Sequence, residues 1–285
     1  MSSFVLTIVI ICCIGIPLNG IVIWLLGFQI KRNPFTILIL NLAIADFGYL
    51  VFLAIYSICF LIGYKSSREI PLLSILFFMN MMYTTSLFLL TAISIDRCVC
   101  VLFPIWHRCS RPKHLSSAVC TVLWIFSVLL VGIQNIMGYV FQYGIWLHLH
   151  FLVSSVLSLP LITISSLILF FKICPKPKQI KRGRILLMIL ITLLCFLILT
   201  LPLHIYVFIN LSDSIYWRQF HGLNNYLILG ASLNSSVNPI IYYLVGRKKR
   251  AQTRQSIKVV FQRVFREDEG PESPENATNR VSTPL

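Results

Sequence analysis

The sequence predicts an all-α membrane protein, a bundle of seven transmembrane helices followed by a short amphipathic helix on the cytoplasmic surface. Two observations support this prediction. Of the 285 residues, 57% are hydrophobic and only 12% are charged, whereas soluble domains are about 45–50% apolar and about 25% charged. The apolar residues also fall into separate stretches, each long enough to supply the roughly 20 residues that cross a bilayer as one helix.

The apolar stretches are separated by short polar or basic segments. The gap at 141–144 is the shortest, so a six-helix alternative with one re-entrant hairpin stays open. Two helices are the better interpretation, because 115–172 is far too long for one span. We expect the first stretch to be a signal anchor, since no basic region precedes it. The expected spans are 4–29, 35–62, 72–103, 115–140, 146–172, 184–211 and 220–245.

The basic residues predict the orientation in the membrane. All but three of the 24 lysines and arginines fall on one side of the expected bundle; the exceptions are Lys65, Arg68 and Arg218. Lysine and arginine accumulate in cytoplasmic loops, so we expect a multi-pass plasma-membrane protein with its N terminus outside and its C terminus in the cytoplasm. The net charge of +15 would then face anionic lipid and cytosolic partners rather than nucleic acid.

Three segments are expected: the seven-helix domain 1–246, an amphipathic cytoplasmic helix 247–266 and a disordered tail 267–285. Apolar residues follow helical spacing in the second segment, although an unstructured basic tail stays open. The acidic, Pro- and Ser-rich composition predicts disorder in the third. The nine cysteines show no metal-like spacing and no extracellular pair, so we expect neither a disulfide nor a cysteine metal site.

Polar side chains within the spans gather at one depth. At about 1.5 Å per residue, several of them fall near mid-bilayer around the Asp46 carboxylate. Two interpretations stay open: hydrogen bonds that join helices, or a small hydrated cavity that holds a hard cation such as Na⁺ between oxygen ligands. The residues concerned are Asn19, Asp46, Ser86, Asn234, Ser235 and Asn238.

Asp96 and Arg97 stand at the cytoplasmic end of the third span. They form either a surface pair whose charges reach out toward water or a latch that holds one packing of the helices. Prolines inside four spans remove backbone hydrogen bonds and allow kinks. They are Pro17, Pro160, Pro202 and Pro239.

Six motifs occur in order along the expected helices: Gly15-x-x-x-Asn19-Gly20, Asn41-Leu-Ala-x-Ala-Asp46, Ser94-Ile-Asp96-Arg97-Cys98, Trp124, the pair Pro160 and Pro202, and Asn238-Pro239-Ile-Ile-Tyr242. Over the whole chain they resemble the rhodopsin-like (class A) G-protein-coupled receptors. Within that class the chain is similar to the Mas-related receptors, on the stretches 31–36, 90–94, 101–113 and 234–242.

This resemblance implies roles for several residues. Arg97 would engage the C-terminal helix of a heterotrimeric G protein, with Asp96 as its resting partner. The helix-six switch would involve Phe196, Thr200 and Pro202. Tyr242 would rotate inward on activation, next to Asn238 and Pro239. The resemblance also implies arrestin and receptor kinases as partners and no cofactor beyond an allosteric Na⁺, for which the matching positions are Asp46, Ser86, Asn234, Ser235 and Asn238.

The sequence departs from the wider class at positions that matter. Thr200 replaces the switch tryptophan, and Cys98 replaces the motif tyrosine. Ile168 stands where helix five often supplies a tyrosine, and Leu72 stands where a disulfide cysteine is usual. Gln134, like Met79, replaces an acidic ligand-binding residue. A cationic amine or strongly basic peptide is therefore a doubtful ligand.

The leading function is conversion of the binding of an extracellular peptide or small molecule into G-protein activation. A receptor that signals without ligand, or does not couple, is the alternative. A transporter would show polar stripes or inverted repeats, and neither is visible. An enzyme is not expected, because Asp46 has no aspartate partner at its depth. Candidate residues for an outer ligand pocket, any of which could serve packing alone, are Asn80, Tyr83, Gln134, His148, His204 and Tyr226.

Overall fold

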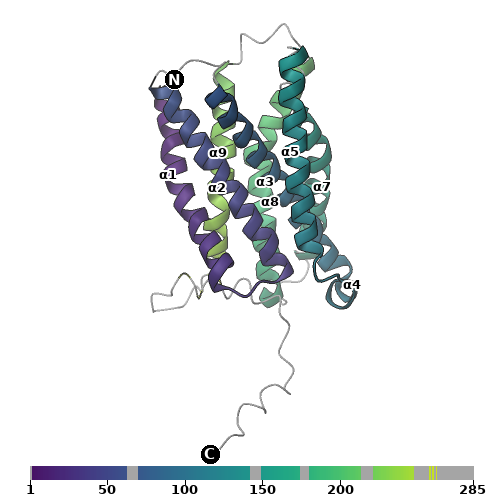
Figure 1. The fold of residues 1–285 in the computed structure, drawn as a ribbon. Coiled ribbons are helices and arrows are strands. Elements are labelled where there is room, and N and C mark those ends of the chain that lie inside the picture. The colour runs from purple at the N-terminus through teal and green to yellow at the C-terminus, as the bar shows by residue number, and fades with distance from the viewer. Residues whose placement is uncertain are drawn as a thin grey trace, which may run out of the picture.

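A computed structural model describes residues 2–62, 70–141, 149–173, 180–212 and 221–246, together with Ile257, Val259 and Phe261. The described chain forms a bundle of long helices that run side by side (Figure 1). The elements are α1 (Ser2–Trp24) with its π-helical continuation η1 (Leu25–Gln29), α2 (Pro34–Leu61), α3 (Ile70–Leu102), α4 (Pro104–Cys109), α5 (Leu115–Phe141), α7 (Leu149–Ile173), α8 (Ile180–Ser212) and α9 (His221–Gly246).

The predicted all-α fold is confirmed, and each expected span corresponds to one long helix. The fourth and fifth spans are the separate helices α5 and α7, which decides against the re-entrant hairpin. By length and composition, α1 with η1, α2, α3, α5 and α7 can each cross a membrane. The start of α1 and the short helix α4 lie at opposite ends of the bundle (Figure 1).

The turn before α2 shows how local sequence starts a helix. The Asn33 side chain accepts from the Thr36 N–H at 2.7 Å, and the Thr36 hydroxyl accepts from the Asn33 N–H at 2.8 Å. This reciprocal capping box satisfies backbone donors that have no partner within the helix. Pro34 occupies the first helical turn, where its missing N–H has no cost. Asn33 and Pro34 therefore begin the helix that carries Asp46.

Burial separates the central helix from the peripheral ones. In α3, 61% of the most apolar window is buried, against 28% for α5. The outward face of α5 exposes large apolar side chains, among them Val122, Leu129 and Ile136. Soluble proteins rarely expose a continuous apolar surface of this kind, whereas hydrocarbon requires one. The inner faces of the helices therefore form the core, and the outer faces are lipid-facing.

Two glycines allow neighbouring helices to approach closely. A Cβ at Gly15 of α1 would collide with Ser236 of α9 and Leu50 of α2. A Cβ at Gly230 of α9 would collide with the backbone carbonyl of Leu199 in α8. Small residues at helix contacts permit this kind of packing in membranes. The glycines thus set the spacing of α9 against α1 and α8.

The predicted amphipathic helix 247–266 falls almost wholly outside the described residues. Ile257, Val259 and Phe261 are described there, each in helical conformation. Phe261 is buried in the hydrophobic cluster at the α4 end of the bundle, whereas the other two are exposed. The rest of this segment and the tail 267–285 lie outside the described part, so both stay predictions.

Candidate functional site

The Asp46 carboxylate of α2 lies in the middle of the bundle and is fully buried. The Ser86 hydroxyl of α3 donates to Oδ1 at 2.7 Å, and the Asn238 amide of α9 donates to Oδ2 at 2.9 Å. Ser235 adds a further side-chain hydrogen bond. A buried charge is tolerated only with such donors. Residues far apart in the sequence therefore meet at the depth that helix geometry indicated.

The same region contains oxygen atoms suited to a hard cation. The Asn19 amide nitrogen donates to the carbonyls of Gly15 and Ser235, at 3.0 Å each. Among the described residues, the buried side-chain oxygens of Asn19 and Asn234 have no hydrogen-bond partner. A carboxylate combined with hydroxyl and amide oxygens is the ligand chemistry of Na⁺ rather than of a soft metal. The donor set at Asp46 therefore fits an oxygen-coordinated cation.

At the α4 end of the bundle, Asp96 and Arg97 form an ion pair. Arg97 approaches Asp96 Oδ2 through Nη2 at 2.6 Å and through Nε at 3.1 Å. The Arg97 residue is only 1% exposed, and its guanidinium lies 4.2 Å from the centroid of the Phe35 ring. Such a cation–π contact adds to the ion pair when the cation is desolvated. Arg97 is therefore enclosed rather than extended to the surface.

The segment from α4 to α5 contributes residues that we did not single out from the sequence. Arg111 Nη2 lies 2.7 Å from the other carboxylate oxygen of Asp96, Oδ1, and His107 Nε2 lies 3.5 Å from it. Arg111 also contacts His107 Nε2 at 2.7 Å and the Ser116 hydroxyl at 2.7 Å. The available signal was the basic stretch 101–113, which entered the sequence analysis through the orientation and the family likeness alone.

The charges around His107 have a definite effect on its ionisation. Burial lowers the pKa of His107 most strongly, and the neighbouring arginines Arg111 and Arg97 lower it further. The Asp96 carboxylate acts in the opposite direction but does not prevail. A neutral imidazole can accept a hydrogen bond from Arg111. This arrangement therefore favours uncharged His107.

The predicted switch residues occupy different environments on α8. Phe196 is 1% exposed and lies in the hydrophobic core. Thr200 is fully buried, and its hydroxyl has no partner among the described residues. Pro202, by contrast, is on the exposed side of the helix. Phe196 and Thr200 thus face the bundle, while Pro202 is on the lipid-facing side.

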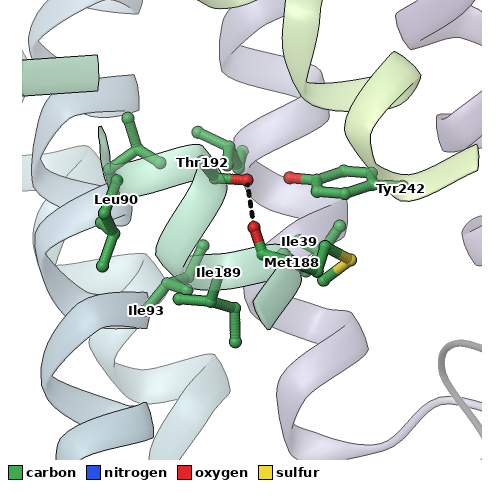
Figure 2. Close-up of a pocket in the computed structure, with 9 residues that line it drawn as sticks. Ile39, Leu90, Ile93, Met188, Ile189, Thr192 and Tyr242 are labelled. Carbon is green, nitrogen blue, oxygen red and sulfur yellow. Dashed lines mark hydrogen bonds between the residues drawn. The ribbon is translucent and has the colours of Figure 1, made fainter. Parts of the chain in front are cut away.

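Tyr242 lines a small, almost entirely apolar cavity between α2, α3, α8 and α9, shown in Figure 2. Its hydroxyl points toward Thr192 of α8, whose own hydroxyl donates to the Met188 carbonyl at 3.0 Å (Figure 2). Asn238 and Pro239, one turn earlier on α9, are both buried. Tyr242 therefore faces space inside the bundle, between the Asp46 and Asp96 regions. The cavity is lined by Ile39, Leu42, Leu90, Ile93, Met188, Ile189, Thr192, Leu193 and Tyr242.

Toward the other end of the bundle, hydrogen bonds connect α3, α7 and α8. Tyr83 Oη lies 3.2 Å from His204 Nε2, and His204 Nδ1 contacts the Ser155 hydroxyl. The Ser155 hydroxyl donates to the Phe151 carbonyl, so its oxygen is left to accept from Nδ1–H. The His204 tautomer then leaves Nε2 to accept from Tyr83. This arrangement fixes the outer part of α8 against its neighbours.

The other pocket candidates do not all join this group. Gln134 is buried on α5, and Asn80 is half-buried on α3. His148 lies outside the described residues, as does the side chain of Tyr226. Ser155 is the residue that the sequence did not reveal, because a serine in an apolar helix carries no distinctive signal. Among the candidates that the structure describes, Tyr83 and His204 are in direct contact.

One further contact joins two motif residues. The Trp124 indole N–H of α5 donates to the Asn41 side-chain oxygen of α2 at 3.0 Å. This hydrogen bond joins α5 to α2. Residues 18–242 match the model of the family described as 7 transmembrane receptor (rhodopsin family).

The chain belongs to this family. The rat "Proto-oncogene Mas" is 37% identical over 94% of this chain and 85% of its own length. The rat "Mas-related G-protein coupled receptor member H" is 37% identical over 97% of this chain and 87% of its own. The human "Mas-related G-protein coupled receptor member D" is 38% identical over 95% and 88%, respectively. The predicted similarity to the Mas-related receptors is therefore confirmed.

Membership settles the class of function. This Mas-related receptor is a multi-pass membrane protein of the G-protein-coupled class, not an enzyme. The helix bundle with its outward apolar faces agrees with that class. The charged groups inside it can accordingly be interpreted as parts of a signalling device rather than as catalysts.

Proposed function

We propose that this receptor lies in the plasma membrane with its N terminus outside and its α4 end in the cytoplasm. An extracellular ligand would bind among the outer ends of the helices and favour a packing that activates a heterotrimeric G protein at the α4 end. The distribution of lysine and arginine supports this orientation. A ligand can produce such a change only by binding one packing more tightly than the other.

The enclosed Arg97 is the observation that carries this proposal. Its guanidinium is held by Asp96 at 2.6 Å and covered by the Phe35 ring. An arginine kept from solvent at the end of a bundle is an expensive arrangement. The burial of Arg97 is explained if a second packing of the helices releases the guanidinium toward a protein partner. We infer that the structure represents the resting packing and that Arg97 meets the G protein after release.

The exposed apolar side chains around α4 support a protein partner at the same end. Ile105 is 80% exposed, Phe103 is 61% exposed and Trp106 is 43% exposed. They project from the segment whose basic residues contact Asp96, beyond the lipid-spanning part of α3. Aromatic and apolar residues at the centre of a patch with a basic rim are typical of protein interfaces. We propose the G protein as the occupant of this surface.

The outer half of the bundle sets the ligand chemistry that we propose. Tyr83, His204 and Ser155 offer uncharged hydrogen-bonding groups, and Tyr83 also lies in ring contact with Phe151 and Tyr49. Asp46 and Asp96 are the acidic residues of the described chain, and both lie farther from this end. An aromatic or uncharged polar ligand group suits these residues better than an ammonium group does.

We also propose that Na⁺ binds beside Asp46 in the resting packing. Asp46, Ser86 and Asn234 would supply oxygen ligands, and the partnerless Asn234 oxygen is the observation that favours this. Bound Na⁺ would neutralise the carboxylate and so favour the packing in which these helices surround it. For the cytoplasmic tail, we propose that receptor kinases modify its serines and threonines and that arrestin then binds.

A nucleotide-exchange assay tests the coupling proposal without a known ligand. Membranes that contain the wild type, Asp96→Asn, Arg97→Ala or the double variant are incubated with each class of Gα subunit. Asp96→Asn removes the resting partner of Arg97 and is expected to raise ligand-independent exchange by roughly twofold to fivefold. Arg97→Ala and the double variant are expected to lose it. Exchange at background for wild type and Asp96→Asn with all Gα classes would favour a non-coupling receptor and refute the proposal.

A further inference from the structure

Asp96 has two arginine partners, and they use different oxygen atoms. Arg97 of α3 binds Oδ2 at 2.6 Å, and Arg111 of the segment after α4 binds Oδ1 at 2.7 Å. The Asp96 side chain is 10% exposed, and the side chains of Arg97 and Arg111 are 2% and 7% exposed. One carboxylate thus stands between two largely buried guanidinium groups. The single negative charge of Asp96 therefore compensates part of the positive charge of each arginine.

Arg111 is held in place independently of Arg97. Its Nη1 contacts His107 Nε2 of α4 at 2.7 Å, and its Nη2 donates to Ser116 of α5 at 2.7 Å. These contacts come from elements that flank Arg111 on both sides in the sequence. Departure of Arg97 would remove none of them. Arg111 would therefore stay beside Oδ1 when the Asp96–Arg97 pair separates.

The free energy of that separation depends on Arg111. A buried carboxylate that loses its only cationic partner is strongly destabilised, because its charge is then left uncompensated away from water. With Arg111 in place, Asp96 keeps one counter-ion after Arg97 has left. The repulsion between the two guanidinium groups is also relieved when Arg97 leaves. Both effects make the release of Arg97 easier than it would be from a simple pair.

We propose that Arg111 is the counter-ion that retains Asp96 when Arg97 is released, and so promotes activation from the loop between α3 and α5. This role rests on the proposed G-protein coupling through Arg97, and it makes Arg111 a positioning residue rather than a G-protein contact. The opposite role, a lock that fastens the loop to α3, would stabilise the resting packing. The two roles predict opposite signs for the same substitution.

The test is ligand-independent nucleotide exchange by the full-length receptor in membranes, at matched surface expression. Arg111→Gln removes the charge and is expected to lower exchange by roughly twofold to fivefold, while Arg111→Lys keeps most of it. Lys113→Gln is the matched control, because Lys113 is an exposed cation of the same loop. We expect Lys113→Gln to leave exchange unchanged.

The decisive comparison repeats Arg111→Gln in the Asp96→Asn background. Without a carboxylate to retain, the loss of Arg111 is expected to have no effect, so Asp96→Asn and the double variant should exchange equally. An increase on Arg111→Gln alone would overturn the inference in favour of the lock. A decrease that persists in the Asp96→Asn background would overturn it in favour of direct contact or misfolding.

These outcomes separate the inference from the function on which it rests. If Asp96→Asn stimulates exchange but Arg111→Gln changes nothing, the coupling proposal stands and the role of Arg111 is wrong. If neither wild type nor Asp96→Asn stimulates any Gα subunit, both fail together. A pH profile adds a second readout: removal of Arg111 takes away a charge that lowers the pKa of His107, so any pH response of exchange should shift to higher pH.

Discussion

Replacement of Ser86 by alanine tests the energetics of the buried carboxylate directly. The Ser86 hydroxyl donates to Asp46 Oδ1 at 2.7 Å, and Asp46 is fully buried. A hydrogen bond to a charged group contributes about 1.5–3 kcal/mol. Because water cannot replace the lost donor without entering the bundle, we expect Ser86→Ala to lower the free energy of unfolding by about that amount.

The expected shift in melting temperature follows from the size of the chain. For chains of about 200 residues, 1 kcal/mol corresponds to about 2–4 °C in Tm, so Ser86→Ala should lower the apparent midpoint by roughly 3–12 °C. Unfolding can be followed with a thiol-reactive dye in detergent. Cys12, Cys98 and Cys120 are buried in the folded receptor and become reactive when the bundle opens.

Ser127→Ala is the matched control for this measurement. Ser127 is also fully buried, but its hydroxyl donates to the Leu123 carbonyl of its own helix at 2.8 Å. That carbonyl is part of the regular α5 helix, so its loss of the extra donor should cost about 1 kcal/mol or less. Equal shifts for Ser86→Ala and Ser127→Ala would refute the view that the Asp46 contact carries special stability.

Three further predictions concern ions, pH and close packing. Replacement of choline by Na⁺ should raise the Tm of the purified wild type, because Na⁺ at ten times its Kd stabilises the folded receptor by about 1.4 kcal/mol. The Tm of Asp46→Asn should not change, and equal shifts for the two proteins would refute a site there. Arg97 is one of the charges that lower the pKa of His107, so its release lets His107 bind a proton more readily. Exchange should therefore increase as the pH falls below about 6.5, by at most about fourfold at pH 6. His107→Gln should abolish that increase, and an unchanged pH response would contradict the assignment. Gly230→Ala should strongly reduce the yield of folded receptor, because the new methyl group meets the Leu199 backbone, whereas Gly132→Ala, with nothing within 4 Å of its added Cβ, should fold normally; similar yields for both would rule out this packing constraint.

Much of the architecture could be predicted because its causes are local. Hydrocarbon requires each backbone N–H and C=O to be satisfied within its own segment, so a long apolar stretch is sufficient to indicate a helix. The capping pair Asn33 and Thr36 likewise acts within a few residues. The depth of Asp46, Ser86 and Asn238 also follows from counting residues along straight helices. Their contact in the structure agrees with that count.

The environment of Asp96 could not be predicted in this way. Its neighbour Arg97 was evident from the sequence, but the sequence left a surface pair and an enclosed latch equally open. Burial beneath Phe35 and the approach of Arg111 depend on how α2, α4 and α5 pack around α3. Nothing in the local pattern states which basic residue of a loop reaches a particular carboxylate oxygen.

The same division applies at the other end of the bundle. Tyr83 and His204 were candidates for an outer pocket, but Ser155 completes their hydrogen bonds from a third helix. The sequence by itself determined the helices, their depth in the membrane and the charges placed within them, because these depend on transfer from water to hydrocarbon, residue by residue. Only the tertiary structure decided which side chains meet, since hydrogen bonds and ion pairs depend on distances of a few ångströms between helices whose rotation and spacing result from the packing of the whole bundle.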